Sequence, residues 1–259
     1  MQRIVLLPLN LIIEFFEGLG RYTVLMAKMF RSIGSLSSIY KRTLEQMVII
    51  GANSIPIVTL TSFFSGMVTS VQSAYQITSS LIPPETIGSI VGETILLELA
   101  PVISALVLTG RVGATITAEI GTMRVTEQID ALESLSFDPV SFLILPRVIA
   151  GSIMFPILIV IADYCGVIGG WTSVIIDPDI NVTTYQFFDG FKQWFKVWSA
   201  WVGIIKALFF GFAITSIACY HGYFTDGGAA GVGKATTMSV VSSCMAVVFL
   251  DYFLSSMLL

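Results

Sequence analysis

Five long runs of apolar residues alternate with polar segments along the chain. They cover residues 47–75, 88–110, 146–172, 201–221 and 237–258. A helix that crosses a lipid bilayer needs about 20 mostly apolar residues, so each run is long enough to form one. Pro56 lies within the first run, and helices embedded in lipid tolerate such a kink. The pattern predicts an all-α integral membrane protein with five transmembrane helices.

The first 33 residues follow a different pattern, with charged residues at regular intervals. Successive charges are 3, 4, 7 and 3 residues apart, at Glu14, Glu17, Arg21, Lys28 and Arg31. On a helix these side chains form one polar stripe, while apolar residues such as Phe16 and Leu19 face elsewhere. We expect an N-terminal amphipathic helix that lies in the membrane interface. An additional membrane span is the alternative, and the charge stripe argues against it.

Lysine and arginine residues are distributed unevenly between the two sides of the predicted membrane domain. Ten lie on the side that holds the N-terminus, whereas the other side has Lys192 and Lys196. This excess predicts that the N-terminus is inside the cell and the C-terminus outside. We expect a single membrane domain over residues 1–259, with an interfacial region at 1–42 and a five-span core at 43–259.

The composition supports a lipid environment and argues against several functions. Hydrophobic residues make up 55% of the chain and charged residues 12%, whereas soluble domains have about 25% charged residues. The net charge of −4 and the absence of a basic tract argue against a nucleic-acid partner. The three cysteines lie far apart within apolar runs, so neither a disulfide framework nor a metal site is expected.

The segment between the second and third runs concentrates charge in an otherwise apolar chain. Its sequence is GRVGATITAEIGTMRVTEQIDALESL, residues 110–135. Ile129, Leu132 and Leu135 recur every three residues among acidic side chains, which predicts an amphipathic helix on the inner side of the membrane. Such a helix with exposed acids is suited to docking another protein. A solvated loop helix without a partner is the alternative.

Several ionisable residues fall inside the predicted spans, where they are costly unless paired or hydrated. At 1.5 Å per residue, Glu98 lies about 15 Å from the outer face, near the middle of the bilayer. Lys206 and Asp251 each lie about 21 Å above the inner face, which predicts an ion pair, with Asp163 as a competing partner. The alternatives are that this pair only fixes helix register and that Glu98 is a protonated packing acid.

The charged segment and its surroundings resemble a known family. Glu98 stands shortly before Pro101, the pattern GR-GA---AEIG-M--TEQI-AL follows at 110–132, and DP and PR follow at 138–139 and 146–147. GVGKATT--VV at 231–241 and LD at 250–251 continue the match. Over residues 45–258 the sequence resembles the MlaE permease family of Mla- and Mce-type lipid transporters, which includes YrbE permeases and a chloroplast lipid-importer permease. Leu97 departs from some members, which carry a basic residue there.

The resemblance implies the permease subunit of an ABC-type phospholipid transporter in the bacterial inner membrane, which helps to maintain outer-membrane lipid asymmetry. It implies a homodimer with a cytoplasmic N-terminus and a periplasmic C-terminus. The implied partners are a cytoplasmic ABC ATPase (MlaF-like), a periplasmic MCE-domain protein (MlaD-like) and, as a further candidate, a small cytoplasmic accessory protein. ATP and magnesium would be bound by the ATPase, so we expect this chain to be non-catalytic and to carry no cofactor.

The resemblance also assigns a role to the charged segment, and the cost of charges inside the membrane suggests roles for the others. The helix around 119–138 would be a coupling helix that receives the stroke of the ATPase. Its charged residues are Glu119, Arg124, Glu127, Glu133 and Asp138. We expect a lipid path through the dimer centre past Glu98, near Gln72 and Tyr75. The pair of Lys206 and Asp251 would brace the outer wall of that path.

Two other classes of function find less support. The sequence GAAGVGKA at 228–235 nearly matches a phosphate-binding loop, but Ala235 replaces the required hydroxyl and no strand precedes it. His221 is the sole histidine, and no serine or cysteine has a plausible base beside it, which argues against an enzyme. A secondary transporter or channel-like protein without an ATPase partner is the alternative, although no internal repeat supports it.

Overall fold

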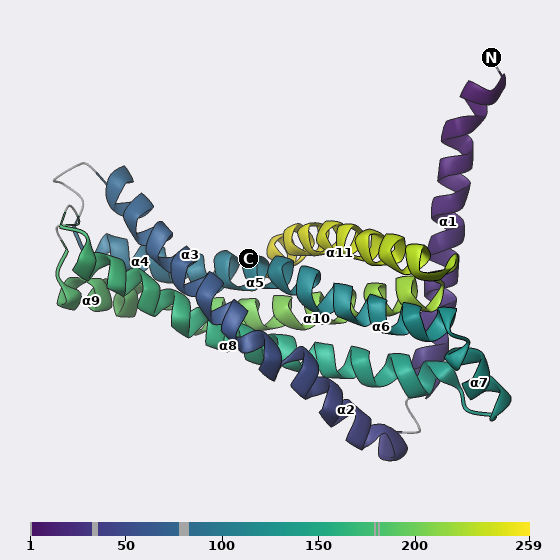
Figure 1. The fold of residues 1–259 in the computed structure, drawn as a ribbon. Coiled ribbons are helices and arrows are strands. Elements are labelled where there is room, and N and C mark those ends of the chain that lie inside the picture. The colour runs from purple at the N-terminus through teal and green to yellow at the C-terminus, as the bar shows by residue number, and fades with distance from the viewer. Residues whose placement is uncertain (1, 33–35, 78–82, 179, 181) are drawn as a thin grey trace.

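The computed structural model describes residues 2–32, 36–77, 83–178, 180 and 182–259, and every regular element within them is helical. The α-helices are α1 (Gln2–Arg31), α2 (Leu36–Ile50), α3 (Ile55–Gln76), α4 (Thr86–Thr94), α5 (Ala100–Leu108), α6 (Ala114–Val125), α7 (Gln128–Ser134), α8 (Leu145–Ile176), α9 (Thr184–Trp194), α10 (Val197–Tyr223) and α11 (Gly228–Leu258). The long helices form one bundle, and α1 stands across one end of it (Figure 1). Helices α7 and α9 lie at opposite ends, called the α7 end and the α9 end below.

Among the residues that the structure describes, five helical stretches are long and apolar enough to cross a membrane. They are Tyr40–Gln76, Thr86–Val125, Val140–Ile176, Val197–Tyr223 and Gly228–Leu258. Each contains one of the predicted spans, so the prediction of an all-α integral membrane fold is confirmed. The second stretch is longer than predicted, because the helix continues to Val125 through much of the segment that we expected to be a loop.

The first span is interrupted where the sequence predicts a kink. Helix α2 ends at Ile50, a single 3-10 turn covers Ala52–Ser54, and α3 then begins with Pro56 in its first turn. Proline is tolerated there because the first N–H groups of a helix have no partner within it. The Ser54 hydroxyl donates to the carbonyl of Ile50 at 2.5 Å and so satisfies an acceptor that the break exposes.

The second span contains two π-helical turns, η3 (Ile95–Leu99) and η4 (Thr109–Gly113), and a third, η5 (Val140–Ile144), opens the third span. Such turns hold more residues than an α-helical turn and often occur at functional sites. The first two turns, η3 and η4, separate α4, α5 and α6, and the second span remains one continuous helical stretch through them. They therefore set which side chains of the second span face each neighbour.

Helices α3 and α8 pack closely because glycines face each other across their contact. A Cβ atom placed on Gly66 would lie 1.9 Å from the carbonyl oxygen of Gly166, and one on Gly169 would lie 2.0 Å from that of Phe63. Ser62 and Ser70 of α3 are buried in the same stripe. Small residues let membrane helices approach until van der Waals packing holds them together.

Replacing Gly66 by alanine should therefore destabilise the protein. The added methyl group meets backbone atoms, which cannot move aside as a side chain does, and overpacking of this kind costs about 1–3 kcal/mol. The unfolding midpoint of the detergent-solubilised protein measures the effect. Gly233→Ala is the matched control, since nothing lies within 4 Å of its added Cβ. Equal midpoints for the two variants would contradict this account of the α3–α8 contact.

Helix α1 is attached to the bundle through its C-terminal half. Leu25, Met26 and Met29 are buried in the core, and the Tyr22 hydroxyl lies 2.8 Å from the Ser216 hydroxyl of α10. Burial raises the pKa of Tyr22, so its phenol stays neutral. The predicted N-terminal helix is thus present, and of its charge stripe Glu17 and Arg21 form an ion pair one turn apart. The side chain of Glu14 lies outside the described residues.

Helix α7 differs from the amphipathic helix that the sequence predicts. Ile129 is buried and Leu132 half-buried, as expected, but Leu135 is 69% exposed. The helix ends at Ser134, and Ser136 takes the left-handed conformation with φ 61°. The N–H of Phe137 then bonds to the carbonyl of Leu132, and that of Ser136 to Glu133. This capping motif turns the chain before Leu135 can join the apolar face.

Candidate functional site

The most buried charged side chain belongs to a cluster that joins three spans. Lys206 of α10 is fully buried, and its Nζ lies 2.8 Å from Oε1 of Glu98 in η3 and 2.9 Å from Oδ1 of Asp251 in α11. The ammonium group also donates to the carbonyl of Leu97 at 3.0 Å. Ser255, one turn beyond Asp251, donates to Glu98 at 3.2 Å. We call Glu98, Lys206, Asp251 and Ser255 the central cluster.

The central cluster presents its acids, not its lysine, to the surroundings. The side chain of Lys206 is 0% exposed, whereas those of Glu98 and Asp251 are 40% and 22% exposed. The ammonium group donates hydrogen bonds to Glu98 and to the carbonyl of Leu97 and lies at ion-pair distance from Asp251, so these oxygen atoms enclose it. A ligand would therefore meet carboxylate oxygens, which accept hydrogen bonds and attract positive charge.

The depth estimates placed Lys206 beside Asp251 but did not place Glu98 beside either. The structure puts both acids within 3 Å of the same nitrogen. Glu98 was estimated to lie deeper than Lys206, and the flexible four-carbon stem of the lysine spans that difference. Lys206 also supplies a cation next to Glu98 from another helix, although Leu97 itself is not basic. Asp163 does not join the cluster, and its Oδ1 has no hydrogen-bond partner within the described residues.

Gln72 and Tyr75 lie apart from the central cluster. Gln72 lines an open groove of about 730 Å³ on α3, together with Thr69, Thr94 and Leu99. Glu98 does not line this groove, because successive residues of a helix point in different directions and Glu98 faces α10 and α11. Tyr75 is 82% exposed and does not line it either. Within one chain, therefore, Glu98, Gln72 and Tyr75 do not share the common wall that we expected.

The residues predicted for coupling lie at the α7 end and mostly contact other helices of the chain. Glu119 of α6 pairs at 3.0 Å with Arg147 of α8, which is nearly fully buried. Arg124 pairs at 2.7 Å with Asp130 of α7, and its guanidinium lies 5.9 Å from the ring centre of Tyr223. These contacts fasten α7 to α6 and lie beside the end of α10.

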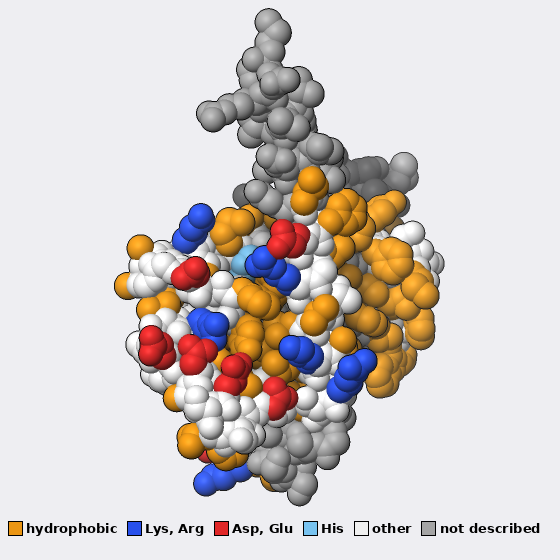
Figure 2. Space-filling model, turned by 90° about the vertical axis from the view of Figure 1, so that its right-hand side faces the viewer, with side chains coloured by type: hydrophobic (Ala, Val, Ile, Leu, Met, Phe, Trp, Pro, Cys, Tyr) orange, Lys and Arg blue, Asp and Glu red, His pale blue; other side chains and the backbone are white. Residues whose placement is uncertain are grey.

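Glu133, Asp138 and Glu127 differ from one another in their surroundings. Glu133 accepts a hydrogen bond from the Tyr223 hydroxyl at 3.3 Å. Asp138 accepts from the backbone N–H groups of Val140 and Ser141, both at 3.2 Å, and thereby caps the start of the third span. Glu127 is exposed, with φ 59°, and joins α6 to α7. Figure 2 looks onto this end, where acidic and basic side chains share the surface.

Comparisons with known proteins agree with this arrangement of spans and charges. A family model described as permease MlaE matches residues 43–257. A probable ABC transporter permease protein of Rickettsia prowazekii is 40% identical over 251 residues, covering 95% of this chain and 93% of its own. The chain belongs to the MlaE permease family. Membership makes it an ABC transporter permease.

Two further relatives of this MlaE family member have names that refer to a lipid. The intermembrane phospholipid transport system permease protein MlaE of Haemophilus influenzae is 32% identical over 249 residues, covering 95% of this chain and 94% of its own. The chloroplastic protein TRIGALACTOSYLDIACYLGLYCEROL 1 of Arabidopsis thaliana is 35% identical over 218 residues. That match covers 84% of this chain and 61% of the plant protein.

The segment that resembles a phosphate-binding loop is not a loop in this MlaE family member. Helix α11 begins at Gly228, so Gly233 and Lys234 lie within its first two turns. The left-handed Gly227 and Gly228, with φ 90° and 68°, make the turn that leads into the helix. A phosphate-binding loop instead wraps backbone N–H groups around the phosphates before its helix begins. This geometry argues against nucleotide binding by this segment.

Proposed function

We propose that the chain is the permease subunit of an ABC-type phospholipid transporter in the bacterial inner membrane. Two copies pair as a homodimer with the α7 end in the cytoplasm and the α9 end in the periplasm. A cytoplasmic ATPase binds the α7 end, and an MCE-domain protein takes up or delivers lipid on the periplasmic side. In a bacterium with two membranes, this transport helps to maintain the lipid asymmetry of the outer membrane.

The observation that carries the proposal is the central cluster. Its two carboxyl groups are partly exposed inside a span, where an acid is tolerable only beside water, a partner or a polar head group. A lipid-filled cavity at the dimer centre supplies both water and head groups to this position. The name of the Haemophilus influenzae relative, an intermembrane phospholipid transport permease, agrees with lipid as the transported molecule.

The α7 end supports the coupling part of the proposal. Helix α7 is joined to α6 by the pair of Arg124 and Asp130, and to α10 by the hydrogen bond between Glu133 and Tyr223. A force that moves α7 is therefore carried directly into the second and fourth spans. The exposed Glu127 and the exposed side of Glu133 are left as contact points for the ATPase.

Photochemical crosslinking tests the lipid path. A photoreactive residue at position 255, beside Glu98, should capture phospholipid in cells, and capture should depend on a working ATPase. The matched control is position 253, which lies two residues from position 255 and therefore on the far side of α11, and where Phe253 is exposed. Equal labelling at both positions, independent of the ATPase, would mean that Glu98 merely packs against Lys206 and would remove the central cluster from the path.

A further inference from the structure

A second polar strip runs along the second span, away from the central cluster. Four side chains recur at intervals of 4, 4 and 3 residues, at Arg111, Thr115, Glu119 and Thr122. Residues with this spacing lie on one face of a helix. We call these four residues the α6 strip. The face is unusual for a membrane span because it would place an arginine and a glutamate toward lipid or an adjoining cavity.

The α6 strip lines two adjoining hollows. Gln46 of α2 lines the first together with Arg111, Thr115 and Glu119. Glu119 and Thr122 also line the second, an open hollow of about 480 Å³, together with Arg147. Glu119 lines both, so the two hollows lie next to each other along the strip, and we call the two together the groove.

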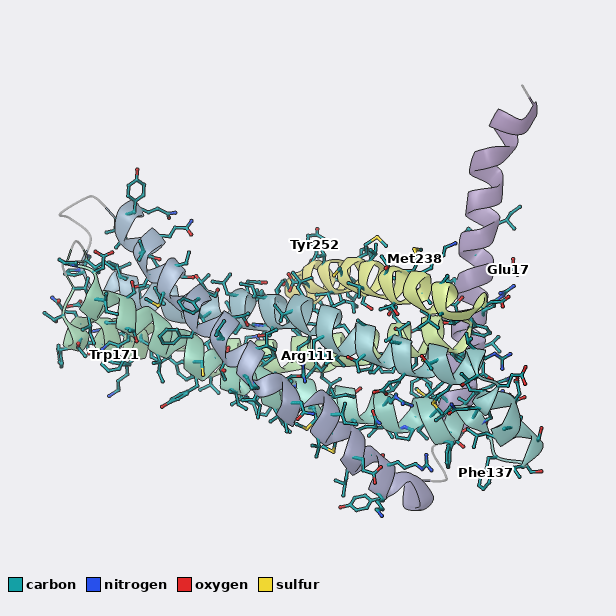
Figure 3. The ribbon with its side chains drawn as sticks, viewed as in Figure 1. Glu17, Arg111, Phe137, Trp171, Met238 and Tyr252 are labelled. Carbon is teal, nitrogen blue, oxygen red and sulfur yellow. The ribbon has the colours of Figure 1, made fainter. Side chains whose placement is uncertain are left out.

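Arg111 has no carboxylate partner within the described residues. Its Nη1 donates to the hydroxyl of Ser54 at the break in the first span. Figure 3 places Arg111 about midway along the bundle, far from both ends. An arginine at such a depth is costly unless an anion or water reaches it.

Other polar atoms in the groove also lack partners. Arg147 is 7% exposed, and its Nε has no hydrogen-bond partner in the described structure. The buried Oε1 of Gln46 also has none there. Two guanidinium groups and one carboxylate line the groove, which leaves one positive charge unbalanced.

The ligand that fits this groove is a phosphate ester with one negative charge. Guanidinium groups bind phosphate through paired, charge-assisted hydrogen bonds. A glycerophospholipid carries such a phosphodiester and has apolar chains that suit the lipid environment of the span. Along the helix, Arg111 lies about 12 Å from Glu119 and about 20 Å from Glu98, at 1.5 Å per residue. The groove therefore lies between the α7 end and the central cluster.

We propose that the α6 strip binds the phosphate of a glycerophospholipid head group, with Arg111 as the principal ligand. The site takes lipid at the level of the cytoplasmic leaflet and is separate from the central cluster. The identity of the ligand and the membrane side rest on the proposed function. The arginine, the groove and the unbalanced charge are features of the chain itself.

Crosslinking from position 115 tests this site. Thr115 is exposed, and its hydroxyl bonds to the carbonyl of Arg111 in its own helix. A photoreactive residue there, in the permease–ATPase complex in vesicles of phosphatidylethanolamine and phosphatidylglycerol, should form a phospholipid adduct that mass spectrometry detects. Arg111→Gln should lower the yield by about tenfold or more, the loss expected when a charge-assisted hydrogen bond is removed. Arg111→Lys should retain more of the yield, because it keeps the charge.

Two further variants separate binding from folding. Ser54→Ala removes the hydrogen-bond partner of Arg111 and leaves its charge in place, so the adduct yield should stay near wild type. Gln46→Glu places a carboxylate beside Arg111 and should lower the yield about as much as Arg111→Gln, because the new charge pairs with the guanidinium. If Ser54→Ala reduces the yield as strongly as Arg111→Gln, Arg111 only holds the break in the first span, and the proposal is wrong.

The remaining outcomes also decide the question. An adduct with a second copy of the chain would make the groove a protein interface and overturn the proposal. Loss of the lipid adduct in excess inorganic phosphate would show that the site takes free phosphate, and would overturn the lipid assignment. Capture at position 255 without capture at position 115 would reject the α6 strip and leave the proposed function standing. Capture at position 115 without capture at position 255 would support the α6 strip and remove the central cluster from the lipid path.

Discussion

Replacing Lys206 by methionine should give the largest loss of stability of any single change in the spans. The variant leaves Glu98 and Asp251 inside the bundle without their shared cation. Removing one partner of a buried ion pair costs about 3–5 kcal/mol. We expect the lower part of that range, because both acids are partly exposed and can draw in water. The unfolding midpoint of the purified protein and its abundance in membranes measure the effect.

Restoring neutrality should recover much of this loss. The triple variant Lys206→Met, Glu98→Gln and Asp251→Asn has no stranded charge, so its unfolding midpoint should rise above that of the single variant. Its lipid transport should stay low if the acids contact head groups. Lys192→Met, at an exposed lysine of α9, is the matched control and should unfold like wild type. A single variant at Lys206 with wild-type stability and transport would show that the cluster contributes to neither.

Reversing the charges of Glu127 and Glu133 together should detach or uncouple the ATPase. Both acids are exposed at the α7 end, and placing like charges opposite each other in an interface costs several kcal/mol. The amount of ATPase that co-purifies should fall by about tenfold or more on that basis. The double variant should still insert into the membrane and dimerise, because Arg124 and Asp130 still hold α7 in place.

Two controls separate docking from local folding. Tyr223→Phe removes the hydrogen bond to Glu133 and leaves both acids in place, so the ATPase should still co-purify. Glu45→Lys reverses an exposed acid on α2 and should have little effect. If the double variant at Glu127 and Glu133 keeps its ATPase and its lipid-stimulated turnover, α7 does not couple the two proteins.

The five spans could be predicted from the sequence because a lipid environment imposes one simple requirement. Each crossing needs a long apolar run whose backbone N–H and C=O groups form hydrogen bonds within its own helix. The depth of an ionisable residue also follows from its place in the run, which is why Lys206 and Asp251 could be paired. Counting residues along each run thus predicts both the spans and the depth of the charged residues within them.

The side-by-side arrangement of the helices could not be predicted in the same way. Apolar runs carry no signal for which span lies next to which, so the approach of Glu98 to Lys206 was missed. The close contact of Gly66 with Gly166 was missed for the same reason. Leu135 fits the apolar period of a helix, but the left-handed Ser136 ends α7 before that period can continue. Local capping overrides periodicity there.

The π-helical turn that holds Glu98 makes the central cluster sensitive to the loss of a single residue. Loss of one residue between Ile95 and Leu99 would convert η3 into an ordinary α-helical turn. Because a π-helical turn holds about one residue more than an α-helical turn, the helices on either side would keep their facing, and only the residues within the turn, Glu98 among them, would shift. A homologous protein with this deletion would keep five spans of normal length and hydropathy. It would nevertheless aim a different side chain at Lys206, and an alignment gap in this turn would mark a changed central cluster.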